Sequence, residues 1–168
     1  MTKSGWTHES TNNESVEWYT PPEIFEALGV RFDLDPCSPG RGKSHVPARR
    51  HITIDQDGLI SPWHGLAFVN PPYGKNTPAW MHKCAEHGNA IALVFSRTDV
   101  KWFQELAEST SAICFVSGRI RFYKGNTTSR GGTPGAGSML IAWGEHAAKI
   151  LQTSDLGVIV HVDKEELI

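Results

Sequence analysis

Four consecutive residues, Asn70-Pro71-Pro72-Tyr73, combine hydrogen-bond acceptors with an aromatic ring. Asn70 has a side-chain carbonyl, and Pro71 has a backbone carbonyl but no N–H. The paired prolines restrict the backbone, so both acceptors are held in place. Two fixed acceptors that converge on one point suit an NH₂ group, which has two hydrogens to donate. Tyr73 adds a face on which a planar base can stack.

This arrangement suits methylation of an exocyclic amine on a planar base. The lone pair of such an amine, as in adenine, is conjugated with the ring, so the amine is a poor nucleophile. Preorganised acceptors for both N–H groups favour the pyramidal nitrogen and free its lone pair. A sulfonium methyl donor held in line would complete the reaction, and no strong base is required. A rigid turn after a strand is the alternative interpretation of the same four residues.

Hydrophobic patterning and turn residues predict strands and helices that alternate around this motif. The predicted helices are residues 21–28, 77–88 and 100–107. The predicted strands are residues 30–34, 52–54, 66–69, 90–95, 112–116, 119–123, 139–143 and 158–162. Thr20 is the predicted cap of the first helix, and residues 36–50 are expected to form a loop. The alternation predicts an α/β fold with an open, mostly parallel sheet and helices on both faces.

Two of these strands end in polar residues. The strand at 66–69 runs directly into Asn70, and the strand at 30–34 ends in Asp35-Pro36. Ligands of open α/β sheets bind beyond the carboxyl ends of the strands. We therefore expect both segments to lie at one edge of the sheet.

The chain has 168 residues, of which 39% are hydrophobic, as is usual for one compact domain. Residues 1–16 are polar and are expected to form a flexible leader, with the domain at 17–168. No apolar stretch approaches the roughly 20 residues that span a bilayer, which favours a cytoplasmic protein without a membrane partner. The three cysteines form no CxxC pair and the histidines no HxxxH pair, so we expect no metal and buried free thiols.

The net charge of −2 gives no global indication of nucleic-acid binding, but basic residues gather in two segments. The segments contain Arg41, Lys43, His45, Arg49, Arg50 and His51, and Arg119, Arg121, Lys124 and Arg130. Such clusters suit phosphate contacts, which provide affinity without sequence specificity. Solvated loops often have the same composition.

The tetrapeptide resembles the Asn/Asp/Ser-Pro-Pro-Tyr/Phe/Trp motif of DNA amino-methyltransferases, and its Asn form resembles the adenine-N6 branch. More closely, the chain is similar to the short, phage-borne proteins of the DNA N-6-adenine-methyltransferase (Dam) family. The resemblance covers residues 17–143 and rests on an ordered set of segments. These are Trp18-Tyr19-Thr20-Pro21, Asp33-Leu34-Asp35-Pro36-Cys37, Asp57-Gly58-Leu59 with Trp63, and Asn70 to Tyr73.

The resemblance implies a single Rossmann-like domain that binds S-adenosylmethionine. The implied cofactor-binding residues are Trp18, Thr20, Pro21, Asp35, Pro36 and Asp57. Thr20-Pro21 would bind the methionine end, since N–H groups at a helix N-terminus suit a carboxylate. Asp35 would face the cofactor's amino group, and Asp57 its adenine amine or a ribose hydroxyl. As alternatives, Thr20 is only a helix cap and both aspartates are only turn residues.

One departure from related enzymes concerns the cofactor loop. A Gly-x-Gly usually follows the first strand, whereas this chain has Pro36-Cys37-Ser38-Pro39-Gly40. The sequence therefore indicates the cofactor contacts less directly than it indicates the catalytic tetrapeptide.

The resemblance also implies a site-specific, adenine-specific DNA-methyltransferase. The amine of an adenine is hidden in the base stack, so we expect base flipping. The candidate DNA-binding residues are Arg41, Lys43, Arg49, Arg50, Arg119, Arg121 and Phe122. Phe122 or Tyr123 is expected to pack near the flipped base. Protection of a phage or prophage genome from restriction is the role expected of the family.

Two other functions remain open. Asn-Pro-Pro-Tyr also occurs in enzymes that methylate the N5 amide of protein glutamine, but those normally have an intact glycine-rich cofactor loop. A non-catalytic DNA-binding module on a methyltransferase scaffold is the second. The intact Asn70, both prolines and Tyr73 argue against such a loss of activity.

Overall fold

A computed structural model describes residues 18–125, 130–132 and 134–164, and the expected leader at 1–16 lies outside these ranges. The strands are β1 (Trp18–Tyr19), β2 (Phe32–Asp35), β3 (Ala48–His51), β4 (Ala67–Val69), β5 (Ala90–Phe95), β6 (Ala112–Val116), β7 (Tyr123–Lys124), β8 (Ser138–Trp143) and β9 (Gly157–His161). The helices are α1 (Pro22–Leu28), α2 (Thr77–His87), α3 (Lys101–Leu106) and α4 (Glu145–Thr153), with 3₁₀ turns η1 (Ile54–Gln56) and η2 (Ala107–Ser109). The α/β class expected from the sequence is confirmed.

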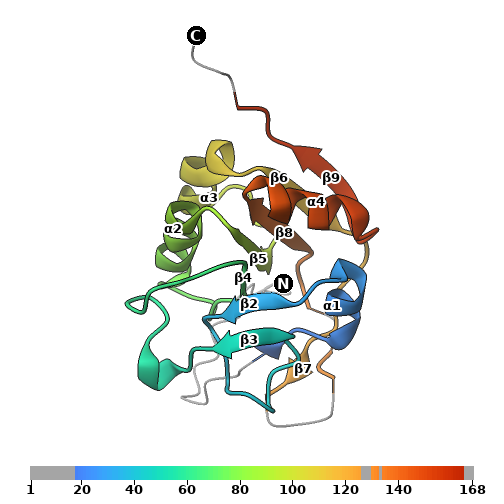
Figure 1. Ribbon diagram of the computed structural model, residues 1–168. Helices are drawn as coiled ribbons and strands as arrows, with labels where there is room; N and C mark the ends of the chain where they lie inside the picture. Colours follow the sequence, from blue (N-terminus) through green and yellow to red (C-terminus); the bar gives the residue numbers. More distant parts are fainter. Residues whose placement is uncertain (1–17, 126–129, 133, 165–168) are drawn as a thin grey trace, which may run out of the picture.

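Seven strands form one sheet in the order β3–β2–β4–β5–β8–β6–β9 (Figure 1). The pairs from β3 to β5 are parallel, whereas β5–β8, β8–β6 and β6–β9 are antiparallel. The prediction of a mostly parallel sheet is therefore wrong for this second half. The reason is the long connection after β6, which returns to the sheet at the carboxyl edge of β5, so that β8 enters there and runs in the opposite direction.

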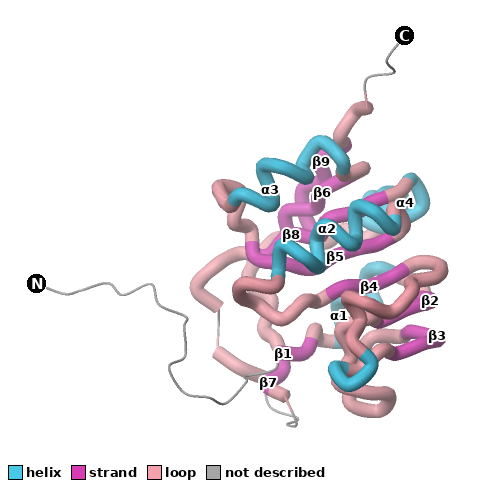
Figure 2. The backbone as a smooth tube through the Cα atoms, turned by 90° about the vertical axis from the view of Figure 1, so that its left-hand side faces the viewer, coloured by secondary structure: helices cyan, strands magenta, loops and turns pink. Residues whose placement is uncertain are grey.

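Helices cover both faces of the sheet, as predicted. The α1 and α4 helices pack on one face, in a hydrophobic cluster that includes Phe25, Phe68 and Leu151. The α2 and α3 helices pack on the other face, in a cluster that includes Trp80, Met81 and Phe103. Figure 2 shows α2 and α3 in front of the strands. We call these the α1/α4 face and the α2/α3 face.

Glycines end the two helices next to the motif segments. Gly29 and Gly88 adopt left-handed conformations (φ of 67° and 72°) that close α1 and α2. Pro21 and not Thr20 is the N-cap of α1, and it makes no side-chain cap bond. The predicted cap at Thr20 is therefore wrong, because the hydroxyl of Thr20 is used elsewhere.

Several other elements differ from the prediction. The predicted loop 36–50 contains the start of β3, and the predicted strand at 52–54 is instead irregular backbone that leads into η1. Only the end of the predicted strand at 119–123 is strand, as β7, and neither β1 nor α4 was anticipated. The β7 strand pairs with β1 outside the main sheet, with Tyr19 opposite Tyr123 (Figure 2).

Candidate functional site

Asn70 lies at the carboxyl edge of the sheet, because β4 ends at Val69. Its amide Nδ2 donates to the backbone carbonyl of Trp18 at 3.1 Å and to the Thr20 hydroxyl at 3.2 Å. A carbonyl oxygen only accepts hydrogen bonds, so the contact with Trp18 fixes which end of the amide faces it. The Oδ1 atom therefore points away, and it is buried without a hydrogen-bond partner among the described residues.

The contacts that orient Asn70 come from residues about fifty positions earlier in the chain. Thr20 is 3% exposed, and its hydroxyl lies beside the Asn70 amide instead of capping α1. Trp18 belongs to β1, and its indole packs so closely on Gly131 that a side chain at that position would overlap the ring. The β1–β7 pair therefore positions the Asn70 side chain.

The two prolines connect Asn70 to the start of α2. Pro71 is buried, and the carbonyl of Pro72 accepts a hydrogen bond from the Thr77 hydroxyl at 3.1 Å. Thr77 Oγ1 also accepts from the Gly74 N–H, which closes the turn. The tetrapeptide is thus a rigid turn, as the alternative interpretation supposed, but one that presents an unpaired acceptor.

Tyr73 forms an aromatic wall with Phe95, the last residue of β5. Their rings are stacked, with centroids 4.5 Å apart and planes 17° from parallel. Tyr73 remains 39% exposed, so part of its surface is accessible to a ligand. Desolvation raises the pKa of the Tyr73 phenol above its ordinary value, although nearby Arg97 opposes the shift. The exposed part of the Tyr73 ring is therefore available for stacking.

Asp35, the last residue of β2, is 2% exposed and already has partners. Its carboxylate accepts from the Cys37 N–H and from the Ser44 hydroxyl at 3.1 Å, and lies 3.5 Å from His51 Nδ1. Ser38 also contacts His51, at 2.9 Å. Asp35 therefore organises the segment that replaces the usual Gly-x-Gly loop, and its carboxylate is not open toward the edge of the sheet.

Asp57 lies near the end of β2 because Gly58 permits close packing. A side chain at Gly58 would overlap the Pro36 carbonyl and the Trp80 indole. Asp57 itself is exposed and has a positive φ of 54°, and one of its oxygens accepts from the Leu59 N–H. The structure thus brings the Asp35-Pro36 and Asp57-Gly58 segments together, and Asp35, Pro36 and Asp57 are expected from the resemblance to bind the cofactor.

The first basic segment lies along β3, an edge strand of the sheet. Arg41 donates to the Arg49 carbonyl at 2.7 Å, Arg49 lies 3.6 Å from Asp33, and Arg50 reaches the Pro62 carbonyl. Lys43 is exposed nearby in sequence. These contacts are at the surface, so the side chains remain accessible to solvent.

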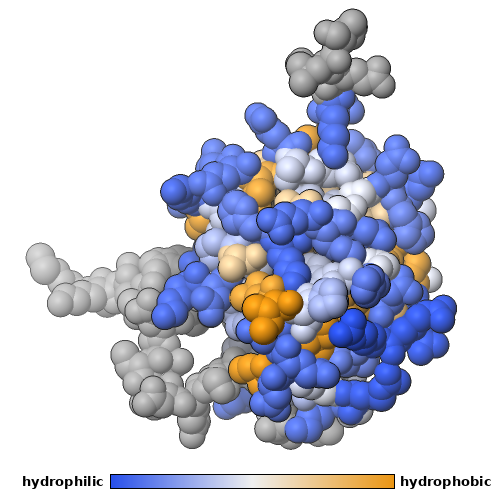
Figure 3. Space-filling model, turned by 60° about the vertical axis from the view of Figure 1, so that its left-hand side comes forward, coloured by the Kyte–Doolittle hydropathy of each residue, from blue (hydrophilic) through white to orange (hydrophobic). Residues whose placement is uncertain are grey.

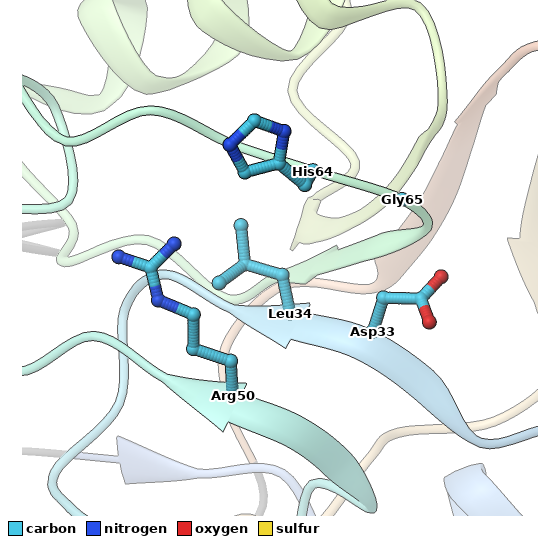
Figure 4. Close-up of a pocket in the computed structure, with 5 residues that line it drawn as sticks. All are labelled: Asp33, Leu34, Arg50, His64 and Gly65. Carbon is cyan, nitrogen blue, oxygen red and sulfur yellow. The ribbon is translucent and has the colours of Figure 1, made fainter.

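A shallow depression of about 310 Å³ lies beside this segment. Figure 4 shows Arg50 and His64 converging above Leu34, while Asp33 points away. His64 and Gly65 precede β4, so this depression lies away from the carboxyl edge where Asn70 and Tyr73 are found. It is separate from the candidate active site.

The second basic segment crosses the carboxyl edge between β6 and β7. Arg119 and Arg121 are exposed, and the guanidinium of Arg119 lies beside Gly137. Phe122 is only 5% exposed and belongs to the α1/α4-face core, so little of its surface faces solvent, and its contact with DNA stays a prediction. Tyr123 is partly buried, with Arg130 over its ring at 5.0 Å.

Three residues at this edge were not identified from the sequence. Phe95 stacks on Tyr73, and Ser138 lies opposite Phe95 in the β5–β8 pair. The positive charge of Arg97 opposes the rise in the pKa of Tyr73. Phe95 and Arg97 could have been found by applying the carboxyl-end rule to the predicted strand at 90–95. Ser138 required knowledge of the strand register.

Within the described ranges there is no cluster of three residues suited to metal binding, and no helix is long and apolar enough to cross a membrane. The cysteines are free thiols, with Cys84 and Cys114 buried and Cys37 partly buried. Burial raises the pKa of all three thiols, that of Cys114 to about 11.

A sequence model of one protein family, described as DNA N-6-adenine-methyltransferase (Dam), matches residues 8–168. The match therefore includes all the segments placed above at the carboxyl edge. The chain matches no curated protein and no solved structure.

Proposed function

Because the chain belongs to the DNA N-6-adenine-methyltransferase (Dam) family, we propose that it transfers a methyl group from S-adenosylmethionine to N6 of a flipped adenine in DNA. At the level of the family, the activity is DNA adenine methylation. The proposal adds the cofactor, the site-specific action, the extrahelical base and the roles of individual residues. It also assigns the sheet to the Rossmann-like methyltransferase type.

The unpaired Oδ1 of Asn70 is the observation that carries this proposal. A buried acceptor without a partner costs about 1–3 kcal/mol, and a donated N–H from the substrate amine removes this cost. The amide cannot rotate to relieve it without losing its contact with the Trp18 carbonyl. Asn70 is therefore preorganised to accept from an amine that enters beside it.

The remaining residues of the tetrapeptide complete the site for a planar amine. The Pro71 carbonyl is the second acceptor, and Tyr73 stacks on the ring of the base. When both N–H groups donate, the lone pair of N6 would be free to accept the methyl group that S-adenosylmethionine supplies. The nitrogen then loses a proton to solvent, since it becomes acidic on methylation.

The residues at the ends of β2 and η1 fit a bound S-adenosylmethionine, which would supply the electrophilic methyl group. The exposed Asp57 has an oxygen available for a ribose hydroxyl or the cofactor's adenine amine. The tight contact of Gly58 with Pro36 holds Asp57 beside the end of β2. Asp35, whose carboxylate is already paired, is proposed to act by shaping the loop around the cofactor's amino group.

Transfer of tritiated methyl groups tests the proposal and separates it from the two alternatives. The purified chain is incubated with labelled S-adenosylmethionine and either duplex DNA or a protein extract, and the modified nucleoside is identified by mass spectrometry. We expect label in DNA as N6-methyladenine. Label only in protein would support glutamine methylation, and DNA binding without label would support a non-catalytic module.

The role of Asn70 is tested by replacement with alanine. Loss of both the acceptor and the orienting contacts should reduce methylation at least about 100-fold, as when a preorganised hydrogen-bonding group is removed from an active site. Affinity for S-adenosylmethionine, measured by calorimetry, should stay within a few-fold. Unchanged activity in Asn70→Ala would refute the proposed role of this residue.

A further inference from the structure

Ser138, the first residue of β8, has the second unpaired buried polar atom among the described residues. The residue is 1% exposed, and its hydroxyl oxygen has no hydrogen-bond partner there. Other buried hydroxyls are satisfied: those of Thr110 and Ser154 donate to backbone carbonyls at 2.7 Å. The only other unpaired atom of this kind in the described ranges is Oδ1 of Asn70, which the proposed function uses.

Strand pairing places the Ser138 side chain beside the aromatic wall. Ser138 lies directly opposite Phe95 in the antiparallel β5–β8 pair. Side chains of directly opposed residues project from the same face, with Cβ atoms about 4.5–5.5 Å apart. Since Phe95 stacks on Tyr73, the hydroxyl of Ser138 lies next to the surface proposed to hold the base.

Asn70 and Ser138 also project from the same face of the sheet. Side chains alternate along a strand, so Asn70, Phe95 and Ser138 project from the same face as the residues two positions away from them. These residues, Phe68, Leu93 and Leu140, all belong to the α1/α4-face core. Both unpaired atoms are thus at the carboxyl edge on that face, separated by the single strand β5.

The spacing of the two groups matches a purine. Adjacent strands lie about 4.8 Å apart, which separates β4 from β8 by roughly 10 Å. Because Val69 pairs with Ala92 and Ser138 with Phe95, Ser138 also lies about two residues further along the sheet than Asn70, so the two backbone positions are roughly 12 Å apart and the side chains must reach over part of this distance. A purine can donate a hydrogen bond from its amine at one side and accept one at the opposite side. The two protein groups that bind it are then separated by about the same distance, which includes two hydrogen bonds of about 3 Å each. In adenine, the ring atom directly opposite the carbon that carries N6 is N3, and N3 has a free lone pair.

We propose that the Ser138 hydroxyl donates a hydrogen bond to N3 of the target adenine, while its N6 amine donates to Asn70. This inference rests on the proposed function and identifies a residue that determines base specificity. In cytosine, the atom across the ring from the amine is N1, which bears the sugar and has no free lone pair. A cytosine amine at Asn70 would therefore leave Ser138 unpaired, a penalty that favours adenine.

Deaza analogues test the proposal. Synthetic duplexes carry adenine, 3-deazaadenine or 7-deazaadenine at the position that the wild-type enzyme methylates, and kcat/KM is measured for each. Removal of N3 should lower kcat/KM about 3- to 10-fold, as expected for one neutral hydrogen bond, and removal of N7 should have less effect. This comparison uses the wild-type protein alone, so it does not depend on the folding of a variant.

The Ser138→Ala variant then assigns the effect to the hydroxyl. It should lower kcat/KM on adenine by a similar factor and show no further loss on 3-deazaadenine, because both changes remove the same bond. Ser154→Ala is the matched control: its hydroxyl is buried and paired at the end of α4, and the variant should retain the 3-deaza effect.

The outcomes separate the two levels of inference. If the wild-type enzyme does not methylate DNA, the proposed function fails. If it methylates adenine but 3-deazaadenine equally well, or if the Ser138→Ala and 3-deaza losses multiply independently, the role of Ser138 is refuted. A loss with 7-deazaadenine that disappears in Ser138→Ala would also contradict the assignment to N3.

Discussion

At the scale of residues, hydrogen bonds to Asn70 decide whether its acceptor faces the substrate. Thr20 Oγ1 lies 3.2 Å from the Asn70 amide nitrogen, and valine matches threonine in shape without this oxygen. We expect Thr20→Val to lower kcat about 3- to 10-fold, while Thr20→Ser, which keeps the oxygen, retains most activity. Steady-state kinetics measures both. A higher KM for S-adenosylmethionine with unchanged kcat would instead indicate a direct cofactor contact.

The three thiols allow a second prediction at this scale. Burial raises their pKa values, so little thiolate is present at pH 8. Only the thiolate is nucleophilic, and we expect alkylation of the native protein to be much slower than alkylation in denaturant. Mass spectrometry after timed quenching measures the rate at each cysteine. Rapid native labelling of Cys84, which is fully buried, would contradict the packing described.

The sequence identified some site residues and missed others for physical reasons. Asn70 and Tyr73 could be predicted because the chemistry lies in one contiguous segment after an apolar strand. Phe122 was expected to contact DNA and lies in the core with Ile120, a burial that the alternating polarity of Arg119-Ile120-Arg121-Phe122 indicates. Ser138 could not be predicted, because its importance depends on which strand lies beside it.

At the scale of elements, Gly58 joins the segment after η1 to the end of β2. Gly58→Ala introduces a methyl group that overlaps the Pro36 carbonyl and Trp80, and backbone atoms cannot move aside cheaply. We expect the free energy of unfolding to fall by about 1–3 kcal/mol, measured by urea denaturation. Gly132→Ala is the control, since no atom lies within 4 Å of its added methyl group. Equal effects in the two variants would refute the packing argument.

The Glu23–Arg130 ion pair connects α1 to the residues after β7. Burial raises the pKa of Glu23, but hydrogen bonds and charge attraction from Arg130 outweigh this effect, and the net pKa is lowered. A lowered folded-state pKa means that the pair stabilises the protein above the ordinary value of 4.5 and is lost as pH falls through the lower folded value.

Glu23→Gln should therefore increase amide hydrogen exchange near Arg130 at pH 7. The difference from wild type should shrink as the pH falls below 4.5, where the wild-type carboxylate is protonated too. Exchange is measured by mass spectrometry at matched intrinsic rates. Glu26→Gln, an exposed change on the same helix, is the control. A difference that persists at low pH would show that charge is not responsible.

Strands could be predicted from the sequence where their hydrophobic pattern matched their position in the folded sheet. The strands at 90–95 and 112–116 match β5 and β6, since both are short apolar runs between turn residues. The β3 strand contains Ala48-Arg49-Arg50-His51, and its polarity is permitted only because it lies at the sheet edge. The β1–β7 pair is too short to give a pattern and depends on a partner about one hundred residues away.

At the scale of the whole molecule, charge distribution is more informative than net charge. The net charge is −2, and the side shown in Figure 3 is mainly hydrophilic. Arg97, Arg119 and Arg121 nevertheless lie at the carboxyl edge with the proposed site. A DNA duplex that delivers a base to Tyr73 would place phosphates near these guanidinium groups.

The salt dependence of binding tests this arrangement. The slope of log K against log salt concentration reflects the number of phosphates neutralised, so Arg119→Ala should reduce its magnitude by about 1. Lys149→Ala, an exposed cationic change on α4, should leave the slope unchanged. Fluorescence anisotropy with a labelled duplex at several salt concentrations provides the slopes. Equal slopes for wild type and Arg119→Ala would remove Arg119 from the DNA surface.

The hydrogen bond from Asn70 to residue 18 ends on a main-chain carbonyl. A main-chain group is present whatever side chain position 18 carries, so the orientation of Asn70 is encoded in the pairing of β1 with β7. In a saturation library selected for methylation, position 70 should accept almost no replacement. Position 18 should accept any residue that can still cover Gly131 and preserve the pairing. Mutational tolerance would then differ sharply between two residues that share one hydrogen bond.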